Sequence, residues 1–225
     1  QALGIMLPLL MVMDAVSLKL YWKKWDHNNA KVIILGGLLG VIIAIFFHRV
    51  ASTNLIQILL GLISIGFVCF EVLKNSFILR ISRMTFNNKI GVFIGISAGF
   101  TSFISHAGGP PVALFLLSQK MSKTLYQSTT VISFWAINIF KVVPYSFLGF
   151  FTWETIKMDI LLAPIAIFGT IAGAHVHKII PESLFFIFTY ILLFLAGTKL
   201  LYDDSDLNKS LQMDSEKVQF NYYHL

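Results

Sequence analysis

The stretch Ser105-His106-Ala107-Gly108-Gly109-Pro110-Pro111 interrupts the longest apolar segment of the chain, Ile90–Ser118. This segment has no charged residue, and it is longer than the roughly 20 residues of one membrane crossing. Two glycines followed by two prolines cannot continue a regular helix, because proline removes a donor and clashes one turn back. We therefore expect two half-length or tilted helices that meet at a break, as a re-entrant hairpin or a tight pair of crossings. Irregular backbone at membrane depth is tolerated only against protein or a wet cavity, so the break is a candidate site.

Composition assigns the chain to the membrane. Of its 225 residues, 56% are hydrophobic and only 12% are charged, and its mean hydropathy is +0.78. Soluble domains carry about 25% charged residues, so this composition excludes an ordinary cytosolic enzyme, a nucleic-acid-binding protein and a disordered chain. The net charge of +6 does not change this conclusion, because the basic residues lie in short gaps between apolar runs. The one cysteine, Cys69, allows neither a disulfide nor a cysteine metal cluster.

The apolar runs predict an all-α membrane protein, a polytopic bundle of transmembrane helices. They are too long and too uninterrupted for the alternating pattern of a membrane β-barrel. We expect residues 1–201 to form a single transmembrane domain and residues 202–225 to form a polar, solvated and mobile C-terminal tail. The predicted segments are Ala2–Leu20, Val32–Phe47, Leu55–Leu73, Ile90–Ser118, Thr129–Phe150, Ile160–His175 and Ser183–Leu201.

The distribution of lysine and arginine predicts the orientation of the chain. Cytoplasmic loops are enriched in these residues, so we place the loops after the first and third segments in the cytoplasm. If Ile90–Ser118 returns to the side where it begins, Lys120, Lys123 and Lys178 are cytoplasmic too, and the tail lies outside. A single crossing would weaken this bias, so we prefer the even number of crossings. The basic residues of the two loops are Lys23, Lys24 and Lys31, and then Lys74, Arg80, Arg83 and Lys89.

Aromatic residues near the segment ends predict where the membrane interfaces lie. Tryptophan and tyrosine are enriched at the level of the lipid headgroups. We assign this anchoring role to Trp22, Trp25, Tyr145 and Trp153.

Two glycine patterns indicate an internal repeat. The second segment contains Gly36-Gly37-Leu38-Leu39-Gly40 and the sixth contains Gly169-Thr170-Ile171-Ala172-Gly173. Each follows a helix with one intramembrane charge, and the predicted topology runs the two units in opposite senses, as in the inverted repeats of secondary transporters. The chain begins with Gln1 and is apolar at once, so we expect that an N-terminal part is missing. Residues 1–73 are then the remainder of the first repeat, and residues 90–201 contain the second.

Lys141 is the first candidate for binding an anion. A charge near the middle of a membrane helix costs about 2.5–3.5 kcal/mol on insertion scales, and such residues face a cavity or a partner. That partner is a transported anion, water, or Asp14 of the first segment. Asn138 lies one turn earlier on roughly the same face, as a ligand or as an interhelical hydrogen bond. Asp14 itself is either an ion-coupling residue or the structural pair of Lys141.

His106 and the residues after it are the second candidate. Histidine binds an anion when charged or donates a hydrogen bond when neutral, although a lone histidine is often only hydrogen-bonded in place. Gly108 and Gly109 expose backbone N–H groups at the start of a half-helix, where the positive end of the dipole attracts anions. Pro110 completes this predicted substrate-binding set.

The motifs of soluble enzymes are absent from the sequence. There is no Walker loop, no Rossmann fingerprint, no Ser/His/Asp order of plausible geometry and no carboxylate pair, so we expect neither an enzyme nor ATP-driven transport. His175 and His177 are two residues apart and point to different helix faces, which does not fit a metal site. We expect no cofactor and no metal.

Four motifs carry a resemblance to a known family. They are the block Thr101 to Leu117 around the break, Thr129-Thr130-Val131, Asn138-x-x-Lys141-x-x-Pro144-Tyr145 and Gly169-x-x-x-Gly173. Over nearly the whole chain up to Leu201, the sequence resembles the TauE/SafE family of sulfite and organosulfonate exporters. The resemblance implies two related halves that each open with a glycine-rich element, of which the first is absent here. It also implies export of small sulfur-containing anions through the inner membrane without a bound cofactor, and it does not choose among these anions.

Together these features predict a secondary transporter of the cytoplasmic membrane, embedded in the lipid bilayer, with a small anion as its partner. The residues alone predict only an anion, and the resemblance implies sulfite or an organosulfonate. Lys141 would supply the charge, His106 and Asn138 polar contacts, and the two glycines backbone donors. The alternatives are a non-catalytic membrane scaffold and a membrane-embedded enzyme. The sequence predicts no oligomeric state.

Overall fold

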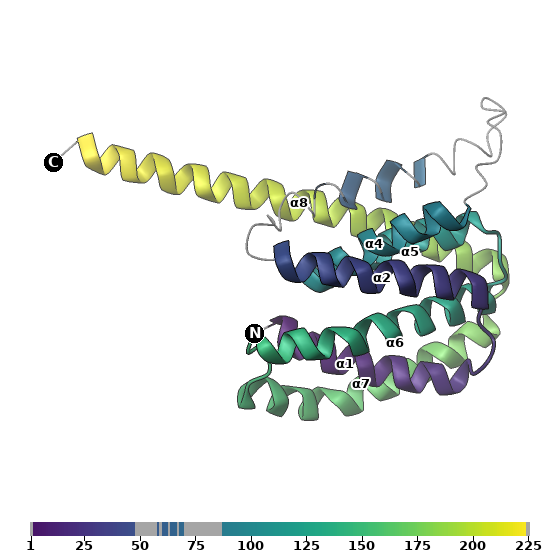
Figure 1. Ribbon diagram of the computed structural model, residues 1–225. Helices are drawn as coiled ribbons and strands as arrows, with labels where there is room; N and C mark the ends of the chain where they lie inside the picture. The colour runs from purple at the N-terminus through teal and green to yellow at the C-terminus, as the bar shows by residue number, and fades with distance from the viewer. Residues whose placement is uncertain are drawn as a thin grey trace.

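The chain folds as a bundle of helices, shown in Figure 1 as a computed structural model. The structure describes residues 2–47, positions 58, 60–62, 64–66 and 68–69, and residues 87–223, with the backbone alone for 203–223. These residues include no β-strand. The helices are α1 (Ala2–Leu20), α2 (His27–Phe47), α4 (Asn88–Ser105), α5 (Gly109–Ser118), α6 (Lys123–Phe147), α7 (Trp153–Ile179) and α8 (Glu182–Tyr223).

Five of the described helices are long and apolar enough to cross a membrane. They are α1, α2, α6, α7 and the part of α8 from Glu182 to Tyr202. The predicted fold class, an all-α polytopic membrane protein, is therefore confirmed. The third predicted segment, Leu55–Leu73, lies largely outside the described residues, as do Arg49, Lys74, Arg80 and Arg83.

Polar caps extend several helices beyond their predicted apolar segments. α2 begins at His27 because the Asp26 carboxylate accepts a hydrogen bond from the N–H of Asn29 at 2.7 Å. α6 begins at Lys123, where the Ser122 hydroxyl accepts from the N–H of Leu125. Hydropathy alone misses these first turns because their side chains are polar. α8 also runs past Leu201 to Tyr223, so the backbone of the predicted tail is helical, and the mobility of the tail stays a prediction.

The break divides Ile90–Ser118 into α4 and α5, as the sequence predicts. α4 ends at Ser105, and α5 begins at Gly109 with prolines in its first turn. His106 caps α4 with a left-handed backbone (φ 53°). The chain thus reverses inside the bundle.

The hairpin of α4 and α5 returns to the end of the bundle where it starts. At that end, the side chain of Asn28, in the first turn of α2, donates a hydrogen bond to the side chain of Asn88 at the start of α4, at 3.1 Å. Ser128, in the second turn of α6, donates to the carbonyl of Lys24 at 2.8 Å. α2, α4 and α6 therefore all begin at one end, and the predicted even number of crossings is confirmed. Which end faces the cytoplasm stays a prediction.

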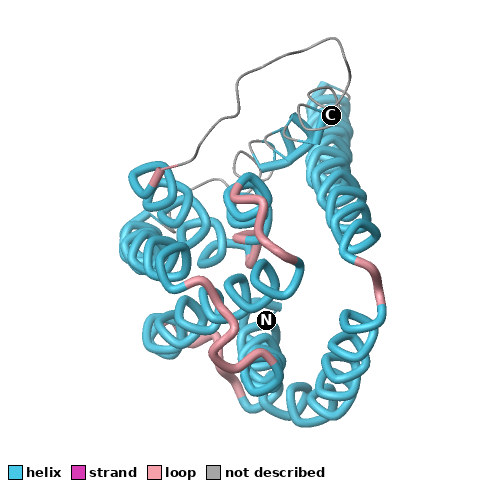
Figure 2. The backbone as a smooth tube through the Cα atoms, turned by 90° about the vertical axis from the view of Figure 1, so that its right-hand side faces the viewer, coloured by secondary structure: helices cyan, strands magenta, loops and turns pink. Residues whose placement is uncertain are grey.

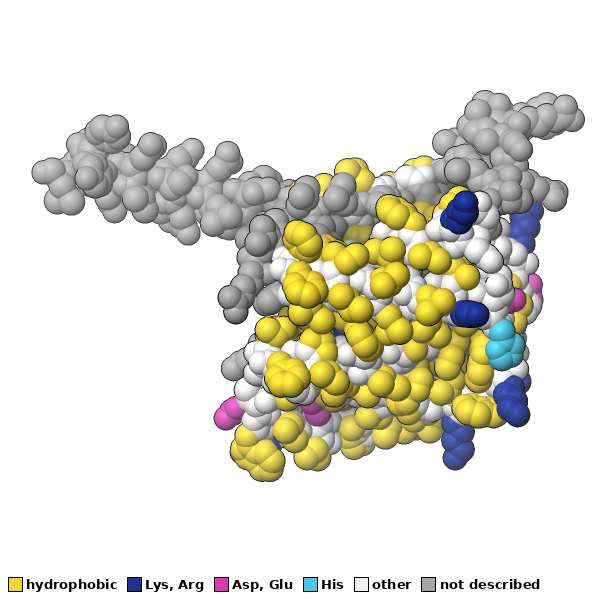
Figure 3. Space-filling view, viewed as in Figure 1, with side chains coloured by type: hydrophobic (Ala, Val, Ile, Leu, Met, Phe, Trp, Pro, Cys, Tyr) yellow, Lys and Arg dark blue, Asp and Glu magenta, His cyan; other side chains and the backbone are white. Residues whose placement is uncertain are grey.

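The end where these helices begin carries most of the basic side chains in view. Figure 2 looks onto this end of the bundle. In Figure 3, hydrophobic side chains cover the middle of the visible face, while lysine side chains gather mostly at the right-hand end, where α1 ends and α6 begins. An apolar band with a basic rim on one side is the pattern of a membrane protein with one cytoplasmic end.

Glycines bring the backbones of α2 and α4 into direct contact. A Cβ on Gly99 would lie 2.0 Å from the carbonyl oxygen of Gly37, and one on Gly40 would lie 2.0 Å from that of Ile96. Small residues in such rows let membrane helices approach closely. Gly169 and Gly173 of α7 meet nothing within 4 Å among the described residues. The two glycine patterns are therefore packed differently, and the internal repeat stays a prediction.

The first helices of the two predicted repeat units run in opposite senses. At the start of α1, a Cβ on Gly4 would meet the carbonyl of Phe150, beyond the end of α6. Just beyond the end of α1, Lys24 lies beside Ser128 near the start of α6. α1 and α6 are thus antiparallel, as the predicted inverted arrangement requires.

Candidate functional site

Lys141 of α6 lies at the end of α4, where the helix breaks. Its side chain is fully buried (0% exposed). The ammonium donates to the carbonyl of Ser102 at 3.1 Å, to the hydroxyl of Ser102 at 2.9 Å and to Nδ1 of His106 at 3.2 Å. A lysine has three N–H donors, so these contacts use all of them.

The hydrogen bonds of His106 define its tautomer. Its Nε2 lies 3.3 Å from the carbonyl oxygen of Leu3 in α1. A carbonyl only accepts, so Nε2 carries the proton and Nδ1 is the lone pair that accepts from Lys141. Of the two predicted roles for His106, the arrangement corresponds to the neutral one. His106 also ties α1 to the break.

Lys141 acts as a cap on the last turn of α4. The final carbonyls of a helix lack intrahelical partners, and its C-terminus carries a partial negative charge that favours a cation. Here the carbonyl of Ser102 accepts from both Lys141 and the N–H of His106. The sequence predicts an anion, water or Asp14 as the partner of the ammonium. The end of a neighbouring helix is a fourth partner, which the local sequence around Lys141 does not indicate.

Asp14 and Lys141 do not form a salt bridge. Within the described part of the chain, no carboxylate lies within 4.0 Å of the Lys141 ammonium. Instead, the Asn138 amide donates to Asp14 Oδ2 at 2.8 Å, and Asn138 is 2% exposed. Asn138 thus makes an interhelical hydrogen bond, and Asn138, not Lys141, contacts the acid. Asn138 and Lys141 lie on one face of α6, where Asn138 contacts Asp14 and Lys141 contacts the break.

Tyr145 lies in the interior, and its predicted place in the interfacial aromatic belt is wrong. Its side chain is 0% exposed, and its hydroxyl donates to the carbonyl of Phe103 at 2.6 Å. Its ring packs edge-on against His106, with centroids 6.0 Å apart. Tyr145 follows Lys141 by one helical turn, so their shared face was the signal for this contact. Tyr145 lies near the end of its segment, but it still contacts the break because α4 is almost long enough to cross the membrane.

The two glycines of the break have different surroundings. Gly108 is buried, and a Cβ there would lie 2.7 Å from the carbonyl oxygen of Ala98. Gly109 is exposed, and a Cβ there would meet nothing within 4 Å of the described atoms. Gly108 therefore serves close packing, and Gly109 is the one whose backbone a ligand can approach.

Proline reduces the donors at the start of α5. Pro110 and Pro111 stand in its first turn and have no N–H. Residues at this position of a helix normally leave unsatisfied N–H groups, so the prolines let the helix begin at membrane depth at low cost. Pro110 thus offers an anion no hydrogen bond, and only the glycines supply backbone donors there.

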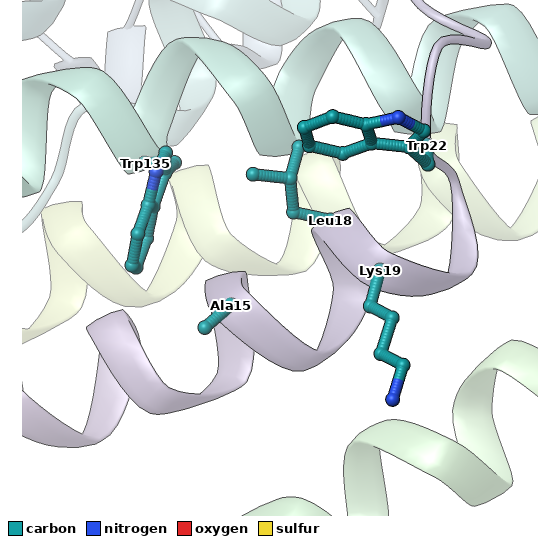
Figure 4. A pocket seen from close by; sticks show the side chains of 5 residues that line it. All are labelled: Ala15, Leu18, Lys19, Trp22 and Trp135. Carbon is teal, nitrogen blue, oxygen red and sulfur yellow. The ribbon is translucent and has the colours of Figure 1, made fainter.

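Two other features of the bundle bear on binding chemistry. The described residues contain no group of three His, Cys, Asp or Glu side chains that could hold a metal ion. A groove of about 280 Å³ lies between α1 and α6 and is lined by Ala15, Leu18, Lys19, Trp22 and Trp135. Figure 4 shows the Lys19 side chain extending away from both indole rings, so the groove itself is apolar.

The fold and the site define a class of protein. Broken helices that face a buried polar site recur in the bundles of secondary transporters. The profile of the sulfite exporter TauE/SafE family matches residues 1–200. The chain belongs to this family of membrane transporters. Comparison with curated proteins finds no match, and comparison with solved structures finds none either.

Proposed function

We propose that the chain is a secondary transporter that exports a small sulfur oxyanion, such as sulfite or an organosulfonate, through the cytoplasmic membrane. Lys141 is the cation that binds the ion. One observation carries this proposal: the ammonium has no exposed surface and no carboxylate within 4.0 Å among the described residues. Family membership supports the sulfur chemistry.

The charge of Lys141 is not compensated by its protein contacts. Burying a charge is costly unless it is paired, and the three acceptors of Lys141 are a carbonyl, a hydroxyl and a neutral imidazole. They satisfy its hydrogen bonds without neutralising its charge. An oxyanion would accept a hydrogen bond from the ammonium and would also neutralise its charge. Hydrogen bonds between charged groups are roughly twice as strong as neutral ones. The ion would displace His106 Nδ1 or the Ser102 hydroxyl from the ammonium.

Access to this site requires movement. Lys141 is enclosed by α4 and α6, so the ion reaches it only when the broken hairpin separates from α6. Gly109, exposed at the start of α5, then adds its N–H to the ion. Asn138 holds Asp14 one turn away, which makes Asp14 the candidate for binding a coupled proton.

The test measures uptake of radiolabelled sulfite into inside-out vesicles that contain the full chain. Lys141→Met keeps most of the stem and removes the charge. We expect the affinity to fall at least about tenfold, equivalent to roughly 1.4 kcal/mol. Lys141→Arg should retain part of the binding, because its planar fork differs from an ammonium. Lys31→Met, on the exposed start of α2, is the matched control.

The same vesicles separate the alternatives. A scaffold gives no saturable sulfite uptake, and an embedded enzyme converts the labelled sulfite to another compound. Uptake of unchanged sulfite that is equal in wild type and Lys141→Met would refute the role of Lys141.

A further inference from the structure

A second cavity with basic walls lies at the opposite end of α6 from Lys141. It has a volume of about 230 Å³ and lies among the end of α1, the start of α6 and the end of α7. Lys123, on its wall, stands 18 residues before Lys141, or about 27 Å along the helix at 1.5 Å per residue. The cavity is therefore separate from the site at the break. Its polar lining residues are Tyr21, Lys24, Lys123, Thr124, His177 and Lys178.

The charge of the cavity is uncompensated. Three of its lining residues are lysines, and no acidic residue lines it. Lys24, Lys123 and Lys178 have no carboxylate within 4.0 Å among the described residues. Three like charges around one small volume repel each other, and an anion between them removes this repulsion.

The wall of the cavity is held in place by specific contacts. The Lys123 ammonium donates to the carbonyl of His177 at 2.6 Å and to that of Ile180, which fixes the end of α7 to the start of α6. His177 is 7% exposed, and its Nε2 lies 3.4 Å from the Thr124 hydroxyl. Its ring stands edge-on to Tyr21, with centroids 5.4 Å apart. These contacts distinguish the cavity from a loose cluster of surface lysines.

We propose that this cavity binds one small oxyanion. Lys24 and Lys178, both exposed, supply the charge, and the Lys123 ammonium has one N–H left after its two carbonyl contacts. The Thr124 hydroxyl adds a neutral donor in the first turn of α6, where the helix dipole also favours an anion. The oxyanion is either a soluble ion such as sulfite or phosphate, or the phosphate of an anionic lipid headgroup. This proposal does not depend on the role of Lys141.

The experiment uses the full chain purified in detergent, in the Lys141→Met background so that binding at the break is removed. Calorimetric titration with sulfite and with inorganic phosphate tests the soluble source. Native mass spectrometry after addition of phosphatidylglycerol or phosphatidylcholine tests the lipid source. The variant is Lys24→Gln with Lys178→Gln. Lys23→Gln with Lys31→Gln removes the same charge from exposed positions outside the cavity.

We expect one anion to bind per chain and the cavity variant to lower its affinity at least about tenfold, because hydrogen bonds from charged donors to an anion are the strong ones and the variant removes two charged donors. The control should bind as the parent does. Binding of sulfite or phosphate identifies a soluble ion, and selective retention of phosphatidylglycerol identifies a headgroup. Thr124→Val should weaken binding without removing charge. Absence of binding to all probes, or equal loss in the cavity variant and the control, would overturn the proposal.

Discussion

Nδ1 of His106 and the ammonium of Lys141 lie 3.2 Å apart, although 35 residues separate them in the sequence. The same histidine ends α4 with a left-handed backbone. Non-glycine residues are uncommon in this conformation, and histidine is among those enriched there. One residue thus turns the chain at the break and accepts a hydrogen bond from the buried lysine.

Substitutions at His106 can separate these two roles. His106→Gly keeps the left-handed turn and loses the imidazole, whereas His106→Ala loses the imidazole and strains the turn. The left-handed conformation costs an L-residue roughly 1–2 kcal/mol, so we expect His106→Ala to be less stable than His106→Gly by about this amount. Unfolding of the purified chain by denaturant measures the difference. Equal stability of the two variants would mean that the turn relaxes without cost.

A double substitution tests whether Asp14 and Lys141 depend on each other. Because Asn138, and not Lys141, contacts Asp14, we expect Asp14→Asn to leave the transport defect of Lys141→Met unrepaired. Sulfite uptake per folded molecule is the measurement. If the double variant regains transport, the two charges act as a structural pair, and the anion-binding role of Lys141 is refuted.

The glycines of the break form a matched pair. Gly108→Ala places a Cβ 2.7 Å from the carbonyl of Ala98, so we expect a loss of about 1–3 kcal/mol in stability, as for overpacked sites. Gly109→Ala adds a Cβ to open space and should change stability by less than about 0.5 kcal/mol.

A larger side chain at Gly109 tests the approach of the anion. Gly109→Leu should lower transport per folded molecule while expression stays near that of the wild type, because the side chain covers the backbone N–H. Parallel loss of expression and transport would indicate a packing role, and unchanged transport would exclude Gly109 from the site.

Cysteine labelling tests the orientation. In a Cys69→Ser background, Lys23→Cys and Lys120→Cys should react with an impermeant maleimide from the cytoplasmic side. Lys157→Cys, in the first turns of α7, should react from the outside. Reaction of Lys23→Cys and Lys120→Cys from opposite sides would contradict the hairpin of α4 and α5.

The sequence was sufficient to predict the features that depend on local chemistry. α1 has the predicted bounds, Ala2–Leu20, because the run is apolar over most of its length. The break falls at the predicted residues because glycine and proline act on their own backbone. Lys141 was identified as a site candidate because an intramembrane charge is conspicuous in any sequence.

The features that depend on distant contacts could not be predicted. The partner of Lys141 is Ser102, 39 residues away, and nothing in its local sequence indicates that α4 ends against α6. Tyr145 is predicted at the membrane interface because its depth in the membrane is inferred only from its distance to the end of the segment. Gly108 and Gly109 are adjacent and chemically identical, so only packing distinguishes them.

The contact between Lys141 and the end of α4 makes ligand binding and local backbone order a single equilibrium. Any ion that draws the ammonium away from Ser102 also removes the cation from the end of α4, and by reciprocity a firmer helix end lowers the affinity for that ion. The amide of His106, bonded to the Ser102 carbonyl at 3.1 Å, lies at this end. Its hydrogen exchange should therefore accelerate when the anion binds, which makes this one amide proton a reporter of occupancy within the membrane.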